Sequence, residues 1–182
     1  RMEQGKVILN SEQFDLKASI EECAGPFRLQ AEKDGKSFLE EYSLQDPVVL
    51  GDPFRMTQIM NNLLSNALKF TNRGDTISVR VTQLKENEHA QYQITVKDTG
   101  IGMSEEFLSK LFEPYARETR FSTRQITGTG LGMPIVKNLV TQMSGQIHVE
   151  STLGEGTSFV ITVPLMPVEE TGQKQRDEAE TS

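Results

Sequence analysis

The sequence predicts a two-layer α/β sandwich, in which a mixed, mostly antiparallel sheet of about five strands is covered on one face by three helices. Three stretches repeat apolar residues at intervals of three and four, which is typical of amphipathic helices. Two pairs of extended segments are joined by polar or glycine-rich turns, which is typical of antiparallel hairpins. Because helices and hairpins interleave without a regular strand–helix–strand repeat, a doubly wound parallel sheet is not expected.

Composition narrows the class of protein. The chain has 182 residues, and 19 Lys and Arg against 26 Asp and Glu give a net charge of −7. The length fits one domain with a modest additional segment, and the acidic balance argues against a nucleic-acid surface. No apolar run reaches the roughly 18–20 residues that a transmembrane helix needs. A single cysteine, Cys23, excludes an internal disulfide and fits a reducing compartment, while two histidines, His89 and His148, argue against histidine-rich metal sites.

The first half of the chain is expected to contain two helices and three extended segments. Residues 1–10 look like the end of a helix, and residues 14–16 are extended. Apolar residues recur at helical spacing over 16–34, where Pro26 should kink or restart the helix because proline lacks a backbone N–H. Strands at 36–44 and 48–52 follow, and Pro53 begins a helix at 53–70.

The helix at 53–70 carries an unusual polar stripe opposite its apolar side. The stripe consists of residues spaced three and four apart, namely Gln58, Asn62, Ser65, Asn66 and Lys69. Asparagine costs a helix about 0.5 kcal/mol or more relative to alanine, and a face that only meets water is built more cheaply from Glu, Lys or Gln. The stripe therefore favours a ligand-binding role over an ordinary solvated face, which is the alternative interpretation.

The second half of the chain alternates hairpins and helices. A hairpin is expected at 76–84 and 92–98, then a helix capped by Ser104 and ended by Pro114, a helix at 133–143, and a final hairpin at 145–165. Residues 115–127 are polar, contain three arginines and few apolar anchors, and are predicted to be flexible. The acidic segment from Pro167 onward is predicted to be disordered.

The glycine clusters point to phosphate binding of an uncommon kind. The P-loop and dinucleotide fingerprints and the eukaryotic kinase signatures are all missing. What is present is a glycine cluster opening the helix at 133–143, where exposed N–H groups attract phosphate. Asp98, at a strand end beside two glycines, could accept a hydrogen bond from a purine amine, and the amide oxygens of the stripe suit Mg²⁺. Each glycine pair alone is equally typical of a tight turn, but together these features suggest a Mg·ATP pocket.

Five motifs in this order resemble the catalytic, ATP-binding domain of sensor histidine kinases, within the GHKL superfamily. They are NNLLSNALKF (61–70), DTGIGM (98–103), LFEPY (111–115), GTGLGM (128–133) and GEGTSF (154–159). The resemblance implies that residues 1–10 end the dimerisation and phosphoacceptor helix with its linker. Residues 11–166 would be the catalytic domain, and 167–182 a disordered acidic tail or a linker to a receiver domain, as in hybrid kinases.

The resemblance also implies roles for individual residues. Asp98 would bind the adenine amine, helped by Thr157 through water, with Gly100 and Gly102 in the same glycine motif. Asn66 would ligate Mg²⁺ with Asn62 nearby. Lys69 would meet phosphate, and Phe70 would pack near adenine or ribose.

The remaining implied residues belong to the phosphate end of the site. Backbone N–H groups of Gly128, Gly130, Leu131 and Gly132 would hold phosphates. Arg117 and Arg124 would reach the γ-phosphate from a flexible ATP lid that orders on binding. Asn62, Lys69 and Arg117 would be the catalytic residues, since phosphoryl transfer depends on positioning and charge neutralisation.

The implied function is Mg·ATP binding and, in the full-length protein, transfer of the γ-phosphate to a histidine of the missing dimerisation domain, in two-component signalling. The alternatives are a GHKL-type ATPase and a nucleotide-free interaction module. The ATPases of this superfamily use a glutamate where this chain has Asn62, and an amide cannot deprotonate water. The expected partners are that dimerisation domain and, indirectly, a response-regulator receiver. The fragment is expected to be a cytoplasmic, largely monomeric piece of a homodimer, with membrane anchoring of the parent left open.

Overall fold

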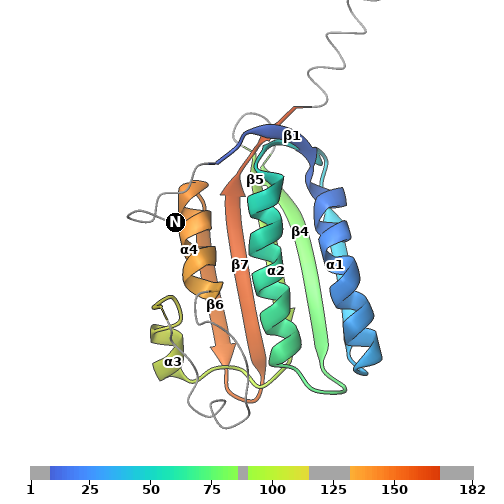
Figure 1. Ribbon diagram of the computed structural model, residues 1–182, viewed down its shortest axis with the longest axis vertical. Helices are drawn as coiled ribbons and strands as arrows, with labels where there is room; N and C mark the ends of the chain where they lie inside the picture. The colour runs from blue at the N-terminus through green and yellow to red at the C-terminus, as the bar shows by residue number, and fades with distance from the viewer. Residues whose placement is uncertain (1–8, 86–89, 115–131, 169–182) are drawn as a thin grey trace, which may run out of the picture.

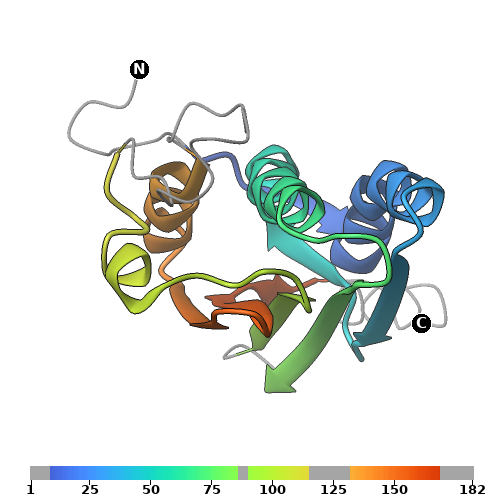
Figure 2. The same cartoon turned by 90° about the horizontal axis from the view of Figure 1, so that it is seen from below.

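The protein folds into two layers, as the sequence predicts. The computed structural model describes residues 9–85, 90–114 and 132–168. Helices α1 (Leu16–Lys33), α2 (Pro53–Lys69) and α4 (Gly132–Gln142) lie over one face of a five-stranded sheet, and the short α3 (Glu105–Ser109) lies beside α4 (Figures 1 and 2). Among the described helices, none is long and apolar enough to cross a membrane.

The main sheet is mixed but mostly antiparallel. Its strands are β2 (Ser37–Ser43), β4 (Thr76–Lys85), β5 (Gln91–Asp98), β7 (Gly156–Pro164) and β6 (Gln146–Thr152), which pair in that order. Only β2 and β4 run parallel, because the chain between them crosses over through α2, whereas the remaining neighbours pair antiparallel. Both predicted hairpins, β4–β5 and β6–β7, are confirmed.

The core lies between this sheet and its helices. The apolar side of α2 is fully buried, including Ile59, Leu63 and Leu64, and it faces alternating strand residues such as Ile94 and Ile161. Burying a side chain of this size contributes roughly 1.5–3 kcal/mol to stability. Because the apolar side of α2 is held against the sheet, the opposite polar stripe has a fixed orientation.

Helix α1 does not restart at Pro26, which was one of the two outcomes expected there, the other being a kink. It is one helix from Leu16 to Lys33, and Asp15 caps it by accepting a hydrogen bond from the Ala18 N–H. Residues Ala24 and Ala31, on either side of the proline, are both buried in the same core. Glu22 and Pro26 are exposed, so water can reach the carbonyl of Glu22, whose helical partner the proline removes.

A second, three-stranded sheet was not predicted. Strands β1 (Glu12–Asp15) and β8 (Met166–Pro167) both pair antiparallel with β3 (Val48–Gly51), which lies between them. This small sheet lies at the upper end of the molecule in Figure 1. Pro167 thus pairs with Val49, and the Val168 N–H donates to the Val48 carbonyl at 3.2 Å. The described fold therefore extends two residues beyond the boundary expected at 166, and the predicted disorder of the rest of the tail falls on residues 169–182, outside the described part.

Candidate functional site

Helix α2 presents two asparagines at the candidate site. Its N-terminus is capped by Asp52, and its amphipathic sequence turns Asn62 and Asn66 away from the core. The Asn62 side-chain amide donates to the Gln58 carbonyl at 3.1 Å, which leaves its Oδ1 as an acceptor. Asn66 lies one turn later, and its side chain has no hydrogen-bond partner among the described residues. Two amide oxygens are thus half-buried and open to a further ligand.

The start of α4 approaches α2 at this point. A Cβ atom at Gly132, the first residue of α4, would lie 3.2 Å from the Asn62 Oδ1. Glycine therefore lets the N-terminus of α4, with its exposed N–H groups and positive dipole end, come close to the asparagine. Gly132 is the one residue of the predicted phosphate-binding group Gly128, Gly130, Leu131 and Gly132 that lies within the described part.

The C-terminal end of α2 is joined to the segment after β5. Phe70 caps the helix, its N–H donates to the Asn66 carbonyl, and its own carbonyl accepts from the Ile101 N–H at 3.0 Å. A Cβ at Gly100 would lie 2.0 Å from the Phe70 oxygen, so no residue larger than glycine fits there. The exposed Lys69 precedes Phe70 at the same end of the helix.

Asp98, the last residue of β5, is a buried carboxyl group. Asp98 is only 6% exposed, and its Oδ1 accepts a hydrogen bond from the Gly100 N–H at 2.9 Å. Burial raises the pKa of Asp98 to about 6, although hydrogen bonds from the backbone N–H groups of Gly100 and Thr157 oppose the shift. At neutral pH the group is mainly an ionised acceptor with little water around it.

Glycines close the site on the side of β6 and β7. Gly102 (φ +68°) and Gly156 (φ +122°) adopt left-handed backbone conformations, and a Cβ at either would lie 2.0 Å from a backbone oxygen, that of Thr152 or of Asp98 respectively. The loop after β5 is therefore packed directly against the β6–β7 turn. This contact places Thr157, the register partner of Asp98, beside the carboxyl group.

Ser151 is a site residue that sequence reasoning missed. Its hydroxyl accepts from the Met103 N–H at 2.8 Å, donates to the Gly156 carbonyl at 2.9 Å and shares a 2.8 Å hydrogen bond with the Thr157 hydroxyl. It thus fixes Thr157 and links the loop after β5 to the final hairpin. The sequence carries no signal for this role, because a serine near the end of a strand is equally common where it has no such role.

The family model of the histidine kinase-, DNA gyrase B- and HSP90-like ATPases matches residues 51–167, which contain all of these groups. The chain belongs to this family. Its relatives include the sensor protein GacS of Pseudomonas syringae pv. syringae, 37% identical over 166 residues that cover 91% of this chain and 18% of the relative. The autoinducer 2 sensor kinase/phosphatase LuxQ of Vibrio vulnificus is 37% identical over 169 residues, 91% of this chain and 20% of the relative. The chain spans about a fifth of the length of these relatives.

Solved structures show the same fold. The mycobacterial sensor histidine kinase MprB superposes with a TM-score of 0.72 at 25% identity, covering 86% of this chain and all of that one (100%). Full-length ShkA in complex with AMPPNP gives a TM-score of 0.75 at 24% identity, covering 89% of this chain and 32% of that one. The family model and the sensor-kinase relatives confirm the sequence-based assignment to the catalytic domain of sensor histidine kinases. The solved structures confirm the predicted fold class.

The structure brings together most of the residues that the sequence singled out. Asn62 lies against Gly132, Phe70 is bonded to the loop that holds Gly100 and Gly102, and Asp98 lies beside Thr157. The predicted lid residues Arg117 and Arg124, together with Gly128, Gly130 and Leu131, lie outside the described residues.

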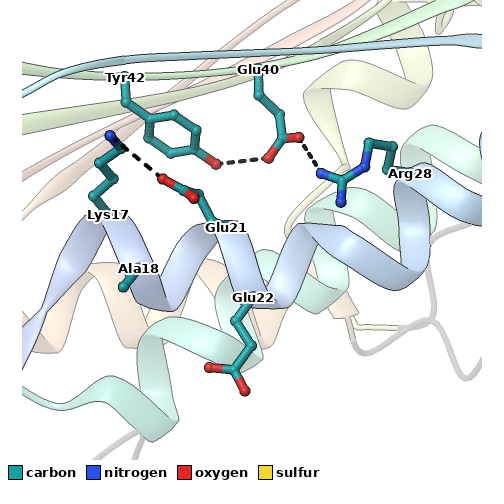
Figure 3. A pocket seen from close by; sticks show the side chains of 7 residues that line it. All are labelled: Lys17, Ala18, Glu21, Glu22, Arg28, Glu40 and Tyr42. Carbon is teal, nitrogen blue, oxygen red and sulfur yellow. Dashed lines mark hydrogen bonds and ion pairs between the residues drawn. The ribbon is translucent and has the colours of Figure 1, made fainter.

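A hollow between α1 and β2 lies apart from this site. Figure 3 shows the residues that line it, namely Lys17, Ala18, Glu21, Glu22, Arg28, Glu40 and Tyr42. Most of these charged groups have partners within the hollow. Glu40 accepts from the Tyr42 hydroxyl at 2.9 Å and forms a salt bridge with Arg28. Lys17 forms a salt bridge with Glu21 at 3.7 Å. Burial, followed by the bond to Glu40, raises the pKa of Tyr42. Within the described ranges no group of three or more His, Cys, Asp or Glu side chains could hold a metal ion.

Proposed function

We propose that this domain binds Mg·ATP at the site described above and, in a longer protein, delivers the γ-phosphate to a histidine of a dimerisation domain, as in two-component signalling. The observation that carries the proposal is the buried carboxyl group of Asp98. The loop around it is packed closely against α2 and the β6–β7 turn, which Gly100, Gly102 and Gly156 allow. Family membership and relatives named as sensor kinases support this function.

The adenine end of the proposed site is made by Asp98 and its neighbours. An ionised carboxylate in a dry pocket is a strong acceptor for the exocyclic amine of adenine, and a neutral amide in its place is weaker. Thr157, held by Ser151, offers a hydroxyl for a bridging water. Phe70 supplies an aromatic side chain at the adjacent end of α2.

The metal end of the proposed site is made by the two asparagines of α2. Neutral amide oxygens suit Mg²⁺ whose charge is already balanced by a triphosphate, and the Asn62 Oδ1 and the Asn66 side chain fit this requirement. Bound Mg²⁺ would supply neutralisation of the charge that develops on the phosphates. In this proposal Lys69 would meet a phosphate oxygen, and the N–H groups at the start of α4 would hold another. Arg117, Arg124, Gly128, Gly130 and Leu131 complete the proposal as lid and loop residues.

Asn62 favours a phosphoryl acceptor other than water. An amide at this position cannot act as the general base that an ATPase of this superfamily needs, so a domain that holds the nucleotide without rapid hydrolysis is favoured. His148 is exposed on strand β6 and paired with Glu150 at 3.1 Å, which is not a helical acceptor context. His89 lies outside the described residues. A nucleotide-free module is disfavoured because all five motifs of the family are present in the sequence.

The proposal is tested by calorimetric titration of Mg·ADP and a non-hydrolysable ATP analogue into the chain. Asp98→Asn should abolish binding while the far-ultraviolet circular dichroism spectrum stays unchanged. Glu12→Gln, an exposed change of equal charge on β1, is the matched control and should bind normally. Unchanged affinity in Asp98→Asn would overturn the adenine assignment.

Phosphate transfer is tested separately with radioactive ATP. The chain alone should retain negligible label, and label should appear on a histidine-containing dimerisation domain when that domain is added. The same domain should carry homodimerisation and contact with a response-regulator receiver, whereas the 182-residue chain should run as a monomer in size-exclusion chromatography. Rapid phosphate release without any acceptor would support the ATPase alternative instead.

A further inference from the structure

Asp52 uses both carboxylate oxygens to join two parts of the chain that are far apart in sequence. Its Oδ1 accepts from the Arg55 N–H at 3.0 Å and so caps α2, while its Oδ2 accepts from the Asn10 N–H at 2.9 Å. Asp52 is only 5% exposed, so both bonds are partly shielded from bulk water. Charge-assisted bonds of this kind are about twice as strong as neutral ones, and the helix dipole favours the negative charge.

The segment that follows Asn10 pairs with the strand that precedes Asp52. Strand β1 pairs with β3, with Glu12 opposite Gly51. A Cβ at Gly51 would lie 3.2 Å from both Phe14, on β1, and Leu165, before β8. The position of Asp52 is therefore set by the segment entering the domain and by the segment leaving it.

Hydrogen bonds continue from Asp52 along one side of α2 to the candidate metal residue. The Arg55 guanidinium donates to the Gln58 side-chain oxygen at 3.0 Å, and the Gln58 carbonyl accepts from the Asn62 amide at 3.1 Å. These residues are spaced three, three and four apart, which places them on one stripe of the helix. The bonds from Asn10 to Asn62 thus follow one another along one side of α2, with successive bonds made by backbone and side-chain groups of the shared residues.

We propose that Asp52 is a positioning residue for the metal end of the nucleotide site, through which the segment entering the domain controls the placement of Asn62. This inference rests on the proposed function, since it concerns the same site. Loss of the Asp52 bonds would loosen the start of α2 and move Asn62 relative to α4. The other end of α2 would stay bonded through Phe70 to the loop that holds Asp98. Because ligation and phosphoryl transfer tolerate only small misplacements, such a shift would change the affinity for the Mg²⁺ complex.

The test measures affinity for a non-hydrolysable ATP analogue with Mg²⁺ and, separately, with EDTA. Asp52→Asn keeps one oxygen to cap α2 but turns an N–H₂ group toward the Asn10 N–H, and Asn10→Pro removes the donor from the other side. Asp15→Asn is the matched control, because Asp15 caps α1 and, among the described residues, its side chain bonds only the Ala18 N–H. Each of the first two variants should weaken binding about three- to tenfold with Mg²⁺ and leave it within about twofold in EDTA. The double variant should bind the nucleotide with about the same affinity as the single variant that binds it less tightly, because both changes remove the same interaction.

A purely structural role for Asp52 predicts another result. Asp52→Asn and Asp15→Asn would then lower the melting temperature alike and leave nucleotide affinity unchanged, which would overturn the inference. Losses of equal size with and without Mg²⁺, or losses that add in the double variant, would also overturn it. If the unchanged chain bound no nucleotide at all, the proposed function itself would fail, which is a distinguishable outcome.

Discussion

The buried position of Asp98 lowers the stability of the domain while supplying the acceptor that the proposed site needs. A carboxyl group whose pKa is raised from 3.8 to about 6 on folding binds its proton more tightly in the folded state. Its contribution to stability is therefore most favourable below pH 3.8, falls between about pH 4 and pH 6, and above that leaves a cost of about 3 kcal/mol. The buried acceptor that suits adenine is thus an unfavourable group in the nucleotide-free domain.

The first prediction follows for stability. Asp98→Asn should raise the melting temperature of the nucleotide-free domain by several degrees at pH 7.5, since it removes the buried charge and keeps an acceptor for the Gly100 N–H. The gain should disappear near pH 4, where the native carboxyl is itself neutral. Thermal unfolding followed by calorimetry at both pH values measures the difference. A gain of equal size at both pH values would contradict the assigned cause.

The second prediction concerns pH and affinity. Since the adenine amine needs an ionised acceptor, affinity for Mg·ADP should fall as the pH drops through about 6, by about tenfold for each unit below it. Titration between pH 5 and pH 8 checks this, with ionisation of the phosphates measured in buffer alone and subtracted. A flat profile would show that Asp98 does not meet the base.

The third prediction concerns Gly100, where added volume has nowhere to go. Gly100→Ala would place a Cβ 2.0 Å from the Phe70 carbonyl oxygen, so it should lower stability by about 2–4 kcal/mol and abolish nucleotide binding. Gly25→Ala in α1 is the contrast, because the nearest neighbour would lie at 3.9 Å and alanine favours helix by about 1 kcal/mol. Urea unfolding should separate the two with opposite signs.

Side chains at the site were predictable to different degrees. Asn62, Asn66 and Asp98 stood out because their types were costly or conspicuous where they occurred, in a helix and at a strand end. Ser151 did not, since its importance depends on a contact between β6 and the loop after β5 that has no trace in its local sequence. Asp52 was predicted only as the last residue of a strand before the helix at 53–70, and its second bond to Asn10 is a contact between distant residues.

Among the elements, local pattern predicted the long ones and failed for short, non-local ones. The helices and both hairpins follow from periodicity and turn residues close in sequence. The small sheet could not be predicted in the same way, because β1 and β8 have four and two residues and pair with a strand far from both. Short strands carry too few alternating positions to indicate a face or a partner.

The fourth prediction concerns helix α1. Pro26 lies within the helix at an exposed position, and a proline there forgoes one hydrogen bond. Pro26→Ala should therefore stabilise the domain by about 1–3 kcal/mol in urea unfolding and leave nucleotide affinity unchanged. A loss of stability would mean that the proline ring makes packing contacts that outweigh the missing bond.

At the scale of the whole molecule, the small sheet joins the beginning and the end of the described fold. The fifth prediction is that removing residues 166–182 should lower stability by about 1–2 kcal/mol, because β8 and its bonds to β3 are lost. Removing only residues 169–182 is the matched control and should leave the urea midpoint unchanged. Equal midpoints for the two truncations would show that β8 contributes nothing.

The arrangement of β1 and β8 on either side of β3 also has a mechanical consequence. Both strands are antiparallel to β3, so the chain enters beside Gly51 and leaves beside Val48, at opposite ends of the same strand. Tension applied between the two ends of the domain would load the β1–β3 and β3–β8 bonds in shear and bypass the five-stranded sheet. Under load, the small sheet would yield first, and Asp52 would carry part of the force to the helix of the candidate site.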